Sequence, residues 1–241
     1  MSKIEYDSYS YVGGREENED SVEGWKRPLS SKHCFVVCDG LGGHGGGQIA
    51  SSGAIACIKK NWNGSISGDE WARLSRLAHE EILQKQTGQC KMKTTLVGLM
   101  LHKNKASWVH AGDSRLYHFY KGKLVFQTRD HSASQLAVML GEITQEEIRF
   151  HEARNRVLRA LGQSGDLNPE CAEAELGEGK HVFLLCTDGF WEYVTEKEMW
   201  ATLRRSNSPK EWINRMRAIH NKRIPKDNDN NTAIAIFLNI D

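Results

Sequence analysis

Two segments of the chain share one pattern, a run of apolar residues that ends in Asp-Gly. Asp39 follows the run 35–38, and Asp188 follows the run 184–187. A carboxylate at the end of a buried strand is partly removed from water, which is costly unless a cation or hydrogen bonds compensate it. The glycine that follows lets the backbone turn sharply and lets its carbonyl approach an ion. Asp-Gly turns are common without any ligand, but the repeated pattern favours a cation site.

Other acidic residues occur beside small residues in four further motifs. These are Glu19 and Asp20 in Asn-Glu-Asp-Ser, Asp113 in Gly-Asp-Ser-Arg, Asp130 in Asp-His-Ser, and Asp229 with Asn230 before the last apolar run. Mg²⁺ and Mn²⁺ prefer oxygen ligands and keep several waters, so a few carboxylates at strand ends are sufficient for a two-metal site. The scarcity of histidine in these motifs argues against zinc.

The glycine-rich run 40–47 follows a predicted strand and opens a helix, and its first six residues match G-x-G-x-x-G. A dinucleotide site would need a second parallel strand that ends in an acid about 20 residues later. The corresponding segment, 59–64, is instead a basic helix end and a turn. A phosphate-binding P-loop would need Gly-Lys-Ser/Thr, which the run lacks. The sequence therefore argues against nucleotide binding.

The chemical motifs lie at the ends of predicted strands. Apolar runs and alternation predict strands at 34–38, 95–101, 124–128, 182–186 and 233–238, with two more between 108 and 120. Capping boxes, in which Ser or Thr is followed three residues later by Glu, predict helix starts at Ser67, Thr144, Thr195 and Ser208. Consecutive strands between two groups of helices favour α+β layering over a doubly wound sheet.

Composition excludes several classes of protein. With 32 Lys and Arg against 31 Asp and Glu in 241 residues, the net charge of +1 gives no footprint for nucleic acid or anionic lipid. No apolar stretch is long enough to be a secretion signal or a membrane span, so we expect a cytoplasmic protein. No linker or repeat interrupts the chain, so we expect residues 1–241 to form one domain, with its six cysteines reduced.

The ordered motifs resemble the bacterial branch of the PP2C-like (PPM) family of metal-dependent serine/threonine protein phosphatases. The matching segments cover almost the whole chain: 15–21, 39–51, 94–96, 111–117, 128–132, 186–191 and 229–232. The resemblance implies a four-layer αββα sandwich in which two central antiparallel sheets are flanked by helices. It implies Mn²⁺ or Mg²⁺ as cofactor, and a water, activated by two ions, that attacks the phosphorus in line. The implied partners are proteins phosphorylated on serine or threonine by a kinase, and we expect a monomer.

The resemblance also implies which residues hold the ions. Asp39 is expected to bridge both ions, and Gly40 to offer its backbone carbonyl. Asp188 and Asp229 are expected to complete the site of the second ion. Asp113 resembles an acid that, together with Asp188, holds a third ion in bacterial members.

Further residues are expected around the ions. Glu19, Asp20 and Asn230 resemble residues that bind waters of the ions, and Arg15 resembles the arginine that binds phosphate. An arginine fork suits bidentate recognition of a phosphate dianion. His44 invites a general-acid role, but eukaryotic members have their histidine directly after Asp-Gly, so we interpret it as a residue of the helix start or as one that lies just behind the metal ligands. The stretch 131–154 resembles a mobile flap that shapes substrate access.

Two alternatives stay open at this stage. A pseudophosphatase would keep the fold and bind a partner without turnover, which the intact carboxylates argue against. A hydrolase of small phosphoesters would have the same pocket chemistry as a protein phosphatase, so only a comparison of substrates separates the two.

Overall fold

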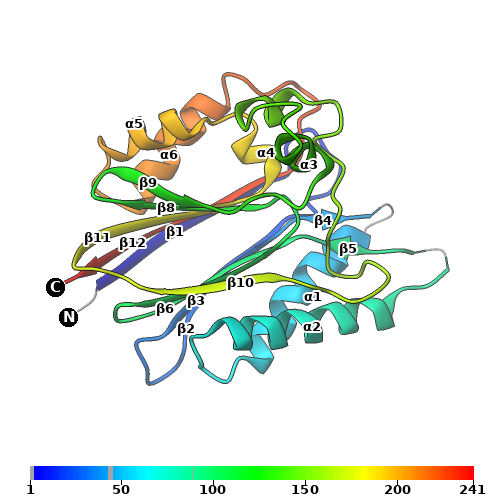
Figure 1. Ribbon diagram of the computed structural model, residues 1–241, viewed down its shortest axis with the longest axis horizontal. Helices are drawn as coiled ribbons and strands as arrows, with labels where there is room; N and C mark the ends of the chain where they lie inside the picture. Colours follow the sequence, from blue (N-terminus) through cyan, green and yellow to red (C-terminus); the bar gives the residue numbers. More distant parts are fainter. Residues whose placement is uncertain (1–2, 43–45, 89) are drawn as a thin grey trace.

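The computed structural model describes residues 3–42, 46–88 and 90–241, and it contains two five-stranded antiparallel sheets that lie face to face (Figure 1). One sheet has the order β1 (Lys3–Tyr11), β12 (Asn231–Ile240), β11 (Gly179–Cys186), β8 (Arg115–Tyr120) and β9 (Lys123–Gln127). The other has the order β10 (Glu170–Glu175), β7 (Lys105–Ala111), β6 (Leu96–His102), β3 (His33–Cys38) and β2 (Ser21–Lys26). A short pair, β4 (Gly40–Leu41) and β5 (Lys93–Thr94), extends beyond the second sheet.

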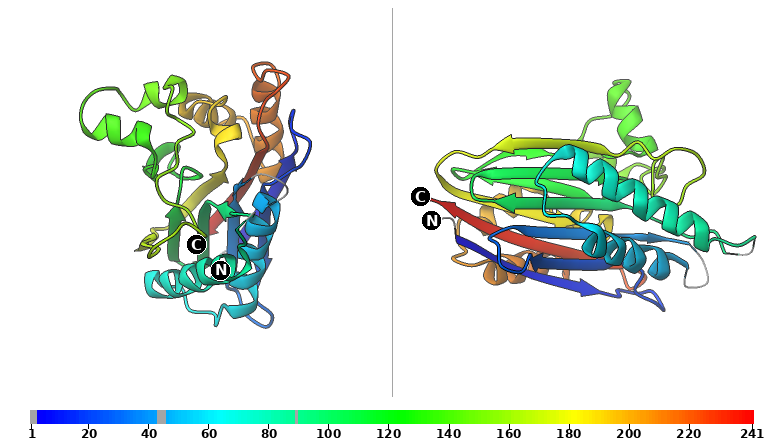
Figure 2. Two further views of the ribbon diagram at one scale, coloured as in Figure 1. Left: turned by 90° about the vertical axis from the view of Figure 1, so that its right-hand side faces the viewer. Right: turned by 90° about the horizontal axis from the view of Figure 1, so that it is seen from below.

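Helices cover the outer faces of both sheets, which confirms the predicted αββα sandwich (Figure 1). The second sheet is covered by α1 (Gly46–Asn61) and α2 (Gly68–Lys85). The first is covered by α4 (Asp188–Trp191), α5 (Glu196–Leu203) and α6 (Pro209–His220). Two further elements, α3 (Ala133–Met139) and the 3₁₀ helix η1 (Glu146–Phe150), lie in the expected flap, residues 131–154, which projects from the sandwich (Figure 2). Among the described residues, none of the helices is long and apolar enough to span a membrane.

The core is divided into three layers by the two sheets. On β3, Phe35 and Val37 point between the sheets, whereas Cys34, Val36 and Cys38 pack under α1 and α2. Both faces of this strand are therefore buried, which is why its sequence is a continuous apolar run rather than an alternation. A third layer lies between the other sheet and helices α4, α5 and α6.

The predicted helix starts agree with the structure to different degrees. Only Thr195 forms the complete capping box, because its hydroxyl accepts the Glu198 amide and the Glu198 carboxylate accepts the Thr195 amide. The hydroxyls of Ser67 and Ser208 accept the third amide of their helices. The Glu70 side chain, however, turns away to Asn63 and Arg73. The α-helix predicted to start at Thr144 is wrong, since the segment from Glu146 forms a 3₁₀ helix instead.

A close contact between helix and sheet generates a stability prediction. An added Cβ at Gly98 of β6 would lie 2.4 Å from Cη2 of the fully buried Trp71. We expect Gly98→Ala to lower the unfolding free energy by about 1–3 kcal/mol through overpacking, measured by urea denaturation. Gly88→Ala, where an added Cβ meets nothing within 4 Å, is the control and should change it by less than about 0.5 kcal/mol. Equal effects of the two substitutions would contradict this packing argument.

Candidate metal centre

A cleft of about 620 Å³ lies at the end of the sandwich where β3, β7 and β11 end and β12 begins. This end of the sandwich lies opposite the two chain termini (Figure 1). Eight of the residues expected at the site line it: Arg15, Glu19, Asp39, Gly40, Asp113, Asp188, Asp229 and Asn230. These residues come from five separate parts of the chain, and the ends of β3, β7, β11 and the start of β12 bring them together. The remaining one, Asp20, is buried next to Glu19.

The backbone of Asp39 is fixed on both sides. Its amide donates to the Thr95 hydroxyl at 2.9 Å, and its carbonyl accepts from the Thr95 amide and the Thr94 hydroxyl, both at 2.8 Å. These bonds hold the strand end after its last ladder pair, so the carboxylate is held at the mouth of the cleft.

The glycines of the two Asp-Gly pairs are needed for close approach rather than for a left-handed turn, because neither has a positive φ. A Cβ at Gly40 would lie 2.3 Å from the Gly47 carbonyl oxygen, and one at Gly189 would lie 2.1 Å from the Asn230 carbonyl oxygen. Only glycine lets the backbone after Asp39 contact the start of α1. In the same way, Gly189 lets the turn after Asp188 contact the start of β12.

Asp188 and Asp229 are held by their neighbouring amides. One oxygen of Asp188 accepts from the Gly189 amide at 2.6 Å, and Oδ1 of Asp229 accepts from the Asn230 amide at 2.8 Å. The other oxygen of Asp229 accepts from Nη2 of Arg15 at 2.9 Å. Arg15 is exposed at the rim of the cleft, so its guanidinium is accessible from solvent.

Asp113 lies in the loop that joins the two sheets, between β7 and β8. The Ser114 hydroxyl shares a 2.7 Å hydrogen bond with the Thr95 hydroxyl, which also contacts Asp39. The Asp113 carbonyl accepts from the indole Nε1 of Trp191 at 2.9 Å. Asp113 is therefore connected on one side to Asp39 and on the other to the helical turn that begins with Asp188.

The residues expected to bind waters of the ions form a connected layer. Asn230 accepts the Glu19 amide at 2.8 Å and donates to the carbonyls of Val12 and Glu17, which fixes the loop that carries Glu19. The Glu19 carboxylate accepts from the Gly47 amide at the start of α1. Asp20 accepts from the Thr187 hydroxyl at 3.0 Å, but its Oδ1 is buried without a hydrogen-bond partner in the described structure.

Burial and mutual repulsion raise the pKa values of these carboxyl groups. The pKa of Asp20 is raised to about 8, mainly by burial and in smaller part by the nearby Asp188 and Asp229. The pKa values of Asp39 and Asp113 lie well above the ordinary range, first because of burial and then because of neighbouring aspartates. Divalent cations relieve both causes, since they supply compensating charge at close range. The all-oxygen donor set and the unpartnered Asp20 oxygen therefore fit Mn²⁺ or Mg²⁺.

Some residues of the cleft were missed from the sequence, and one expected residue lies outside the described structure. Asn155 and Val157, which follow the flap, line the cleft although no motif marks them. Glu16 and Glu17 also line it, and their position next to Arg15 was the only available signal. His44, interpreted as a residue of the helix start, belongs to the residues that the structure leaves undescribed.

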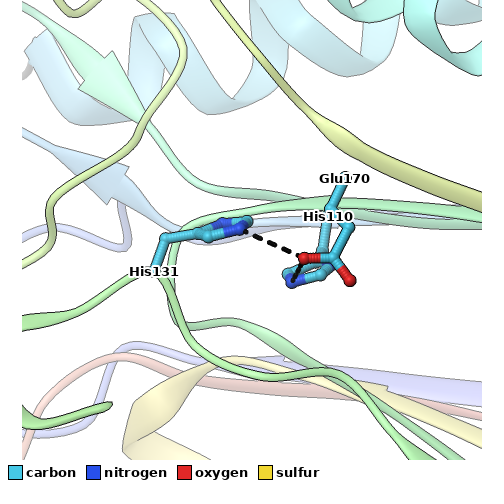
Figure 3. A group of neighbouring side chains, drawn as sticks. All are labelled: His110, His131 and Glu170. Carbon is cyan, nitrogen blue, oxygen red and sulfur yellow. Dashed lines mark ion pairs between the residues drawn. The ribbon is translucent and has the colours of Figure 1, made fainter. Parts of the chain in front are cut away.

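A second group of metal-ligating side chains lies outside the cleft (Figure 3). One potential ligand atom from each of His110, His131 and Glu170 lies within 4.8 Å of the others, and the imidazole rings stack with centroids 4.5 Å apart. Nε2 of His110 lies 3.8 Å and Nε2 of His131 lies 3.6 Å from the same Glu170 oxygen.

The hydrogen bonds of this group assign a proton to one of the two nitrogens that face Glu170. Nε2 of His110 lies 2.8 Å from the Arg129 carbonyl, which can only accept, so this nitrogen carries a proton. The two ring nitrogens of His131 both face donors, since Nδ1 lies 3.2 Å from the Gly112 amide and Nε2 lies 2.8 Å from Nη1 of Arg159. The protonated Nε2 of His110 has no lone pair for a metal, and the guanidinium of Arg159 already occupies the side of His131 that faces Glu170. The group is therefore better described as imidazoles that face a carboxylate and an arginine than as a second metal site.

The raised pKa values predict a pH dependence of stability in the metal-free protein. Because the pKa of Asp20 is raised to about 8, the folded state keeps a proton that the unfolded state loses above about pH 4, and stability falls as pH rises towards 8. In EDTA, we expect the wild type to lose about 1 kcal/mol more unfolding free energy between pH 7 and 8 than Asp20→Asn does. Urea denaturation measures the difference, and Mn²⁺ should reduce it.

Comparing two variants with identical histidines cancels the contribution of the buried imidazoles. Burial lowers the pKa of His131 to about 3 and that of His118 to about 4. The unfolding free energy contributed by these histidines therefore falls as the pH drops below about 6.5, whereas that contributed by Asp20 falls as the pH rises. The same pH slope in wild type and Asp20→Asn would show that Asp20 is ionised in the folded protein.

Comparison with known proteins identifies the family. No protein-family model matches the chain. The serine/threonine protein phosphatase PstP of Mycobacterium tuberculosis is 32% identical over 196 residues, which is 79% of this chain but only 37% of PstP. The serine/threonine phosphatase stp of Listeria welshimeri is 29% identical over 206 residues, which is 81% of this chain and 77% of that relative.

The solved structure of the PstP catalytic domain in complex with two manganese ions has a TM-score of 0.84 at 26% identity, and the match covers 100% of both chains. With the same ordered acidic motifs gathered in one cleft, the chain belongs to the PP2C-like (PPM) family of serine/threonine protein phosphatases, in its bacterial branch.

Proposed function

We propose that this chain is a metal-dependent protein serine/threonine phosphatase in which residues 1–241 form one catalytic domain. The observation that carries the proposal is the convergence of Asp39, Asp188 and Asp229 on one cleft, with the backbone of Gly40 beside them and Arg15 at the rim. This donor set suits two hard divalent ions. The manganese ions in the PstP catalytic domain support Mn²⁺ as the first choice, with Mg²⁺ as an alternative.

In the proposed reaction, the side chains of the protein hold the ions, orient their waters and neutralise charge on the substrate phosphate. When bound, the divalent ions supply an activated water and neutralise charge on the phosphoryl oxygens. Asp39 and Asp188, which follow strands of different sheets, would hold the ions between them, and Asp229 would complete the set. We assign Asp113 and Asp188 to a third ion, while Glu19, Asp20 and Asn230 would orient waters of the ions.

Arg15 has the geometry for a phosphate-binding role at the entrance. In the structure its guanidinium pairs with Asp229 at 2.9 Å, and the side chains are 56% and 41% exposed. An exposed pair of this kind contributes little to stability, so the guanidinium can turn towards a phosphate dianion at little cost. The dianion offers two oxygens to the planar fork, which strengthens the new contact.

We infer phosphoserine and phosphothreonine residues of proteins, produced by a serine/threonine kinase, as the substrates. The named relatives are serine/threonine phosphatases, which supports this substrate class. A monomer acting in the cytoplasm is part of the same proposal. A partner-binding pseudophosphatase is disfavoured because the carboxylate set is complete, and a small-phosphoester hydrolase would show higher kcat/KM on small esters than on phosphopeptides.

The decisive experiment separates an enzyme from a binding module. Wild type should hydrolyse p-nitrophenyl phosphate and phosphothreonine peptides with Mn²⁺, lose activity in EDTA, and regain it with excess Mn²⁺. Asp39→Asn should abolish turnover in a protein that melts at least as high as the metal-free wild type, because one repelling carboxylate is removed. Asp69→Asn, at an exposed acid in the first turn of α2, is the control and should stay active. Metal-independent turnover, or none by folded wild type with Mn²⁺, contradicts the proposal.

Substitution of Arg15 tests phosphate recognition. Arg15→Met should lower kcat/KM by tens-fold, on the order of 2 kcal/mol, because a charge-assisted bidentate contact is lost. Arg15→Lys keeps the positive charge without the planar fork, so its kcat/KM should lie between those of the wild type and Arg15→Met. Product inhibition by inorganic phosphate is a second measurement of the same contact, because the inhibition constant for phosphate should rise in Arg15→Met. An unchanged inhibition constant would show that Arg15 does not contact the phosphate.

A further inference from the structure

The flap is connected to the body of the protein by two arginine–glutamate pairs. Nη2 of Arg149 lies 2.6 Å from Oε1 of Glu196, and Nε of Arg154 lies 2.9 Å from Oε1 of Glu192. Glu192 directly follows α4, and Glu196 is the first residue of α5. Both pairs therefore end on the segment that begins with Asp188, so the flap is attached close to the proposed metal centre.

Trp191 connects this segment to Asp113. It is the last residue of the helical turn that begins with Asp188, and its indole Nε1 donates to the Asp113 carbonyl at 2.9 Å. The guanidinium carbon of Arg115 lies 3.4 Å from the centroid of the indole ring, and that of Arg149 lies 5.4 Å from it. The indole is thus held by one arginine from β8 and one from the flap, and both are cation–π contacts.

The contacts of the two arginines differ in kind. Arg115 makes a bidentate pair with Asp130, with distances of 2.8 and 2.7 Å, and belongs to the rigid sheet. Arg149 belongs to the flap, is 8% exposed, and its Nη1 is buried without a hydrogen-bond partner in the described structure. A buried guanidinium with an unpaired donor contributes little net stability, and an apolar side chain of the same size is often no worse. Folding stability alone therefore does not account for an arginine at this position.

We propose that Arg149 is a positioning residue, which links the placement of the flap to ion binding by holding the Trp191 indole against the Asp113 carbonyl. The inference rests on the proposed function, in particular on the role of Asp113 in holding an ion. Because such coupling is reciprocal, an ion at Asp113 and Asp188 favours the docked flap, and an undocked flap weakens binding of that ion. Arg149 does not line the cleft, so its effect reaches the reaction through Trp191 and Asp113.

The first test measures how activity depends on Mn²⁺ in the full chain. Arg149→Met should raise the Mn²⁺ concentration for half-maximal hydrolysis of p-nitrophenyl phosphate by about threefold or more and lower kcat, with KM unchanged. Arg149→Lys keeps a cation beside Glu196 and the indole, and should recover part of the loss. Arg223→Met is the matched control, because Arg223 pairs with Glu198 of the same helix α5, whereas the cation–π contacts of Trp191 among the described residues come from Arg115 and Arg149. It should leave the Mn²⁺ response unchanged.

The second test measures the coupling without turnover. In wild type, Mn²⁺ should slow backbone hydrogen exchange in residues 131–154, and in Arg149→Met this protection should be lost or much reduced. Asp113→Asn distinguishes a failure of the proposed ion site at Asp113 from a failure of the link through Arg149. If Asp113→Asn alters the Mn²⁺ response and Arg149→Met does not, the link through Arg149 is wrong and the role of Asp113 stands. A normal response in both variants overturns both.

Discussion

The crowding of carboxylates at one edge of the sandwich is the constraint on which the rest of the structure depends. Asp20, Asp39, Asp113 and Asp188 have raised pKa values, and burial is the largest cause for each. Without cations these carboxylates repel one another and are poorly hydrated because they are buried. The site therefore lowers the unfolding free energy rather than raising it. A polypeptide keeps such a site only if the rest of the fold prevents the side chains from moving apart.

The fold meets this requirement by placing the acids at strand ends with fixed backbones. The Thr95 hydroxyl extends the sheet hydrogen bonds past the last ladder pair by accepting the Asp39 amide, and the Thr187 hydroxyl holds the side chain of Asp20 by donating to its carboxylate. The apolar layers under the helices and between the sheets provide the stability that the cleft lacks. Function and stability are thus separated in space, since the cleft lies at one edge and the packed layers extend away from it.

The parts of this arrangement that the sequence predicts are those in which neighbours along the chain determine the outcome. The strand before Asp39 could be predicted because both of its faces are buried, which leaves a continuous apolar run. Strands β1, β2 and β10 could not, because they lie at sheet edges and carry polar, partly exposed residues. Glu70 could not either, because its carboxylate prefers Asn63 and Arg73 to the helix start. Such choices depend on tertiary contacts that no local pattern records.

The division of the acids between the two sheets explains why the core between them matters for the site. Asp39 follows a strand of one sheet, Asp188 and Asp229 adjoin strands of the other, and Asp113 lies in the loop between them. The separation of the two sets of ligands is therefore determined by the side chains packed between the sheets, such as Phe35 and Phe183. Interiors are close-packed and do not deform continuously, so the core between the sheets acts as a spacer for the ions. Trp191 adds a direct connection across the same gap through the Asp113 carbonyl, which makes the distance between the two sets of ligands depend on a specific hydrogen bond as well as on packing.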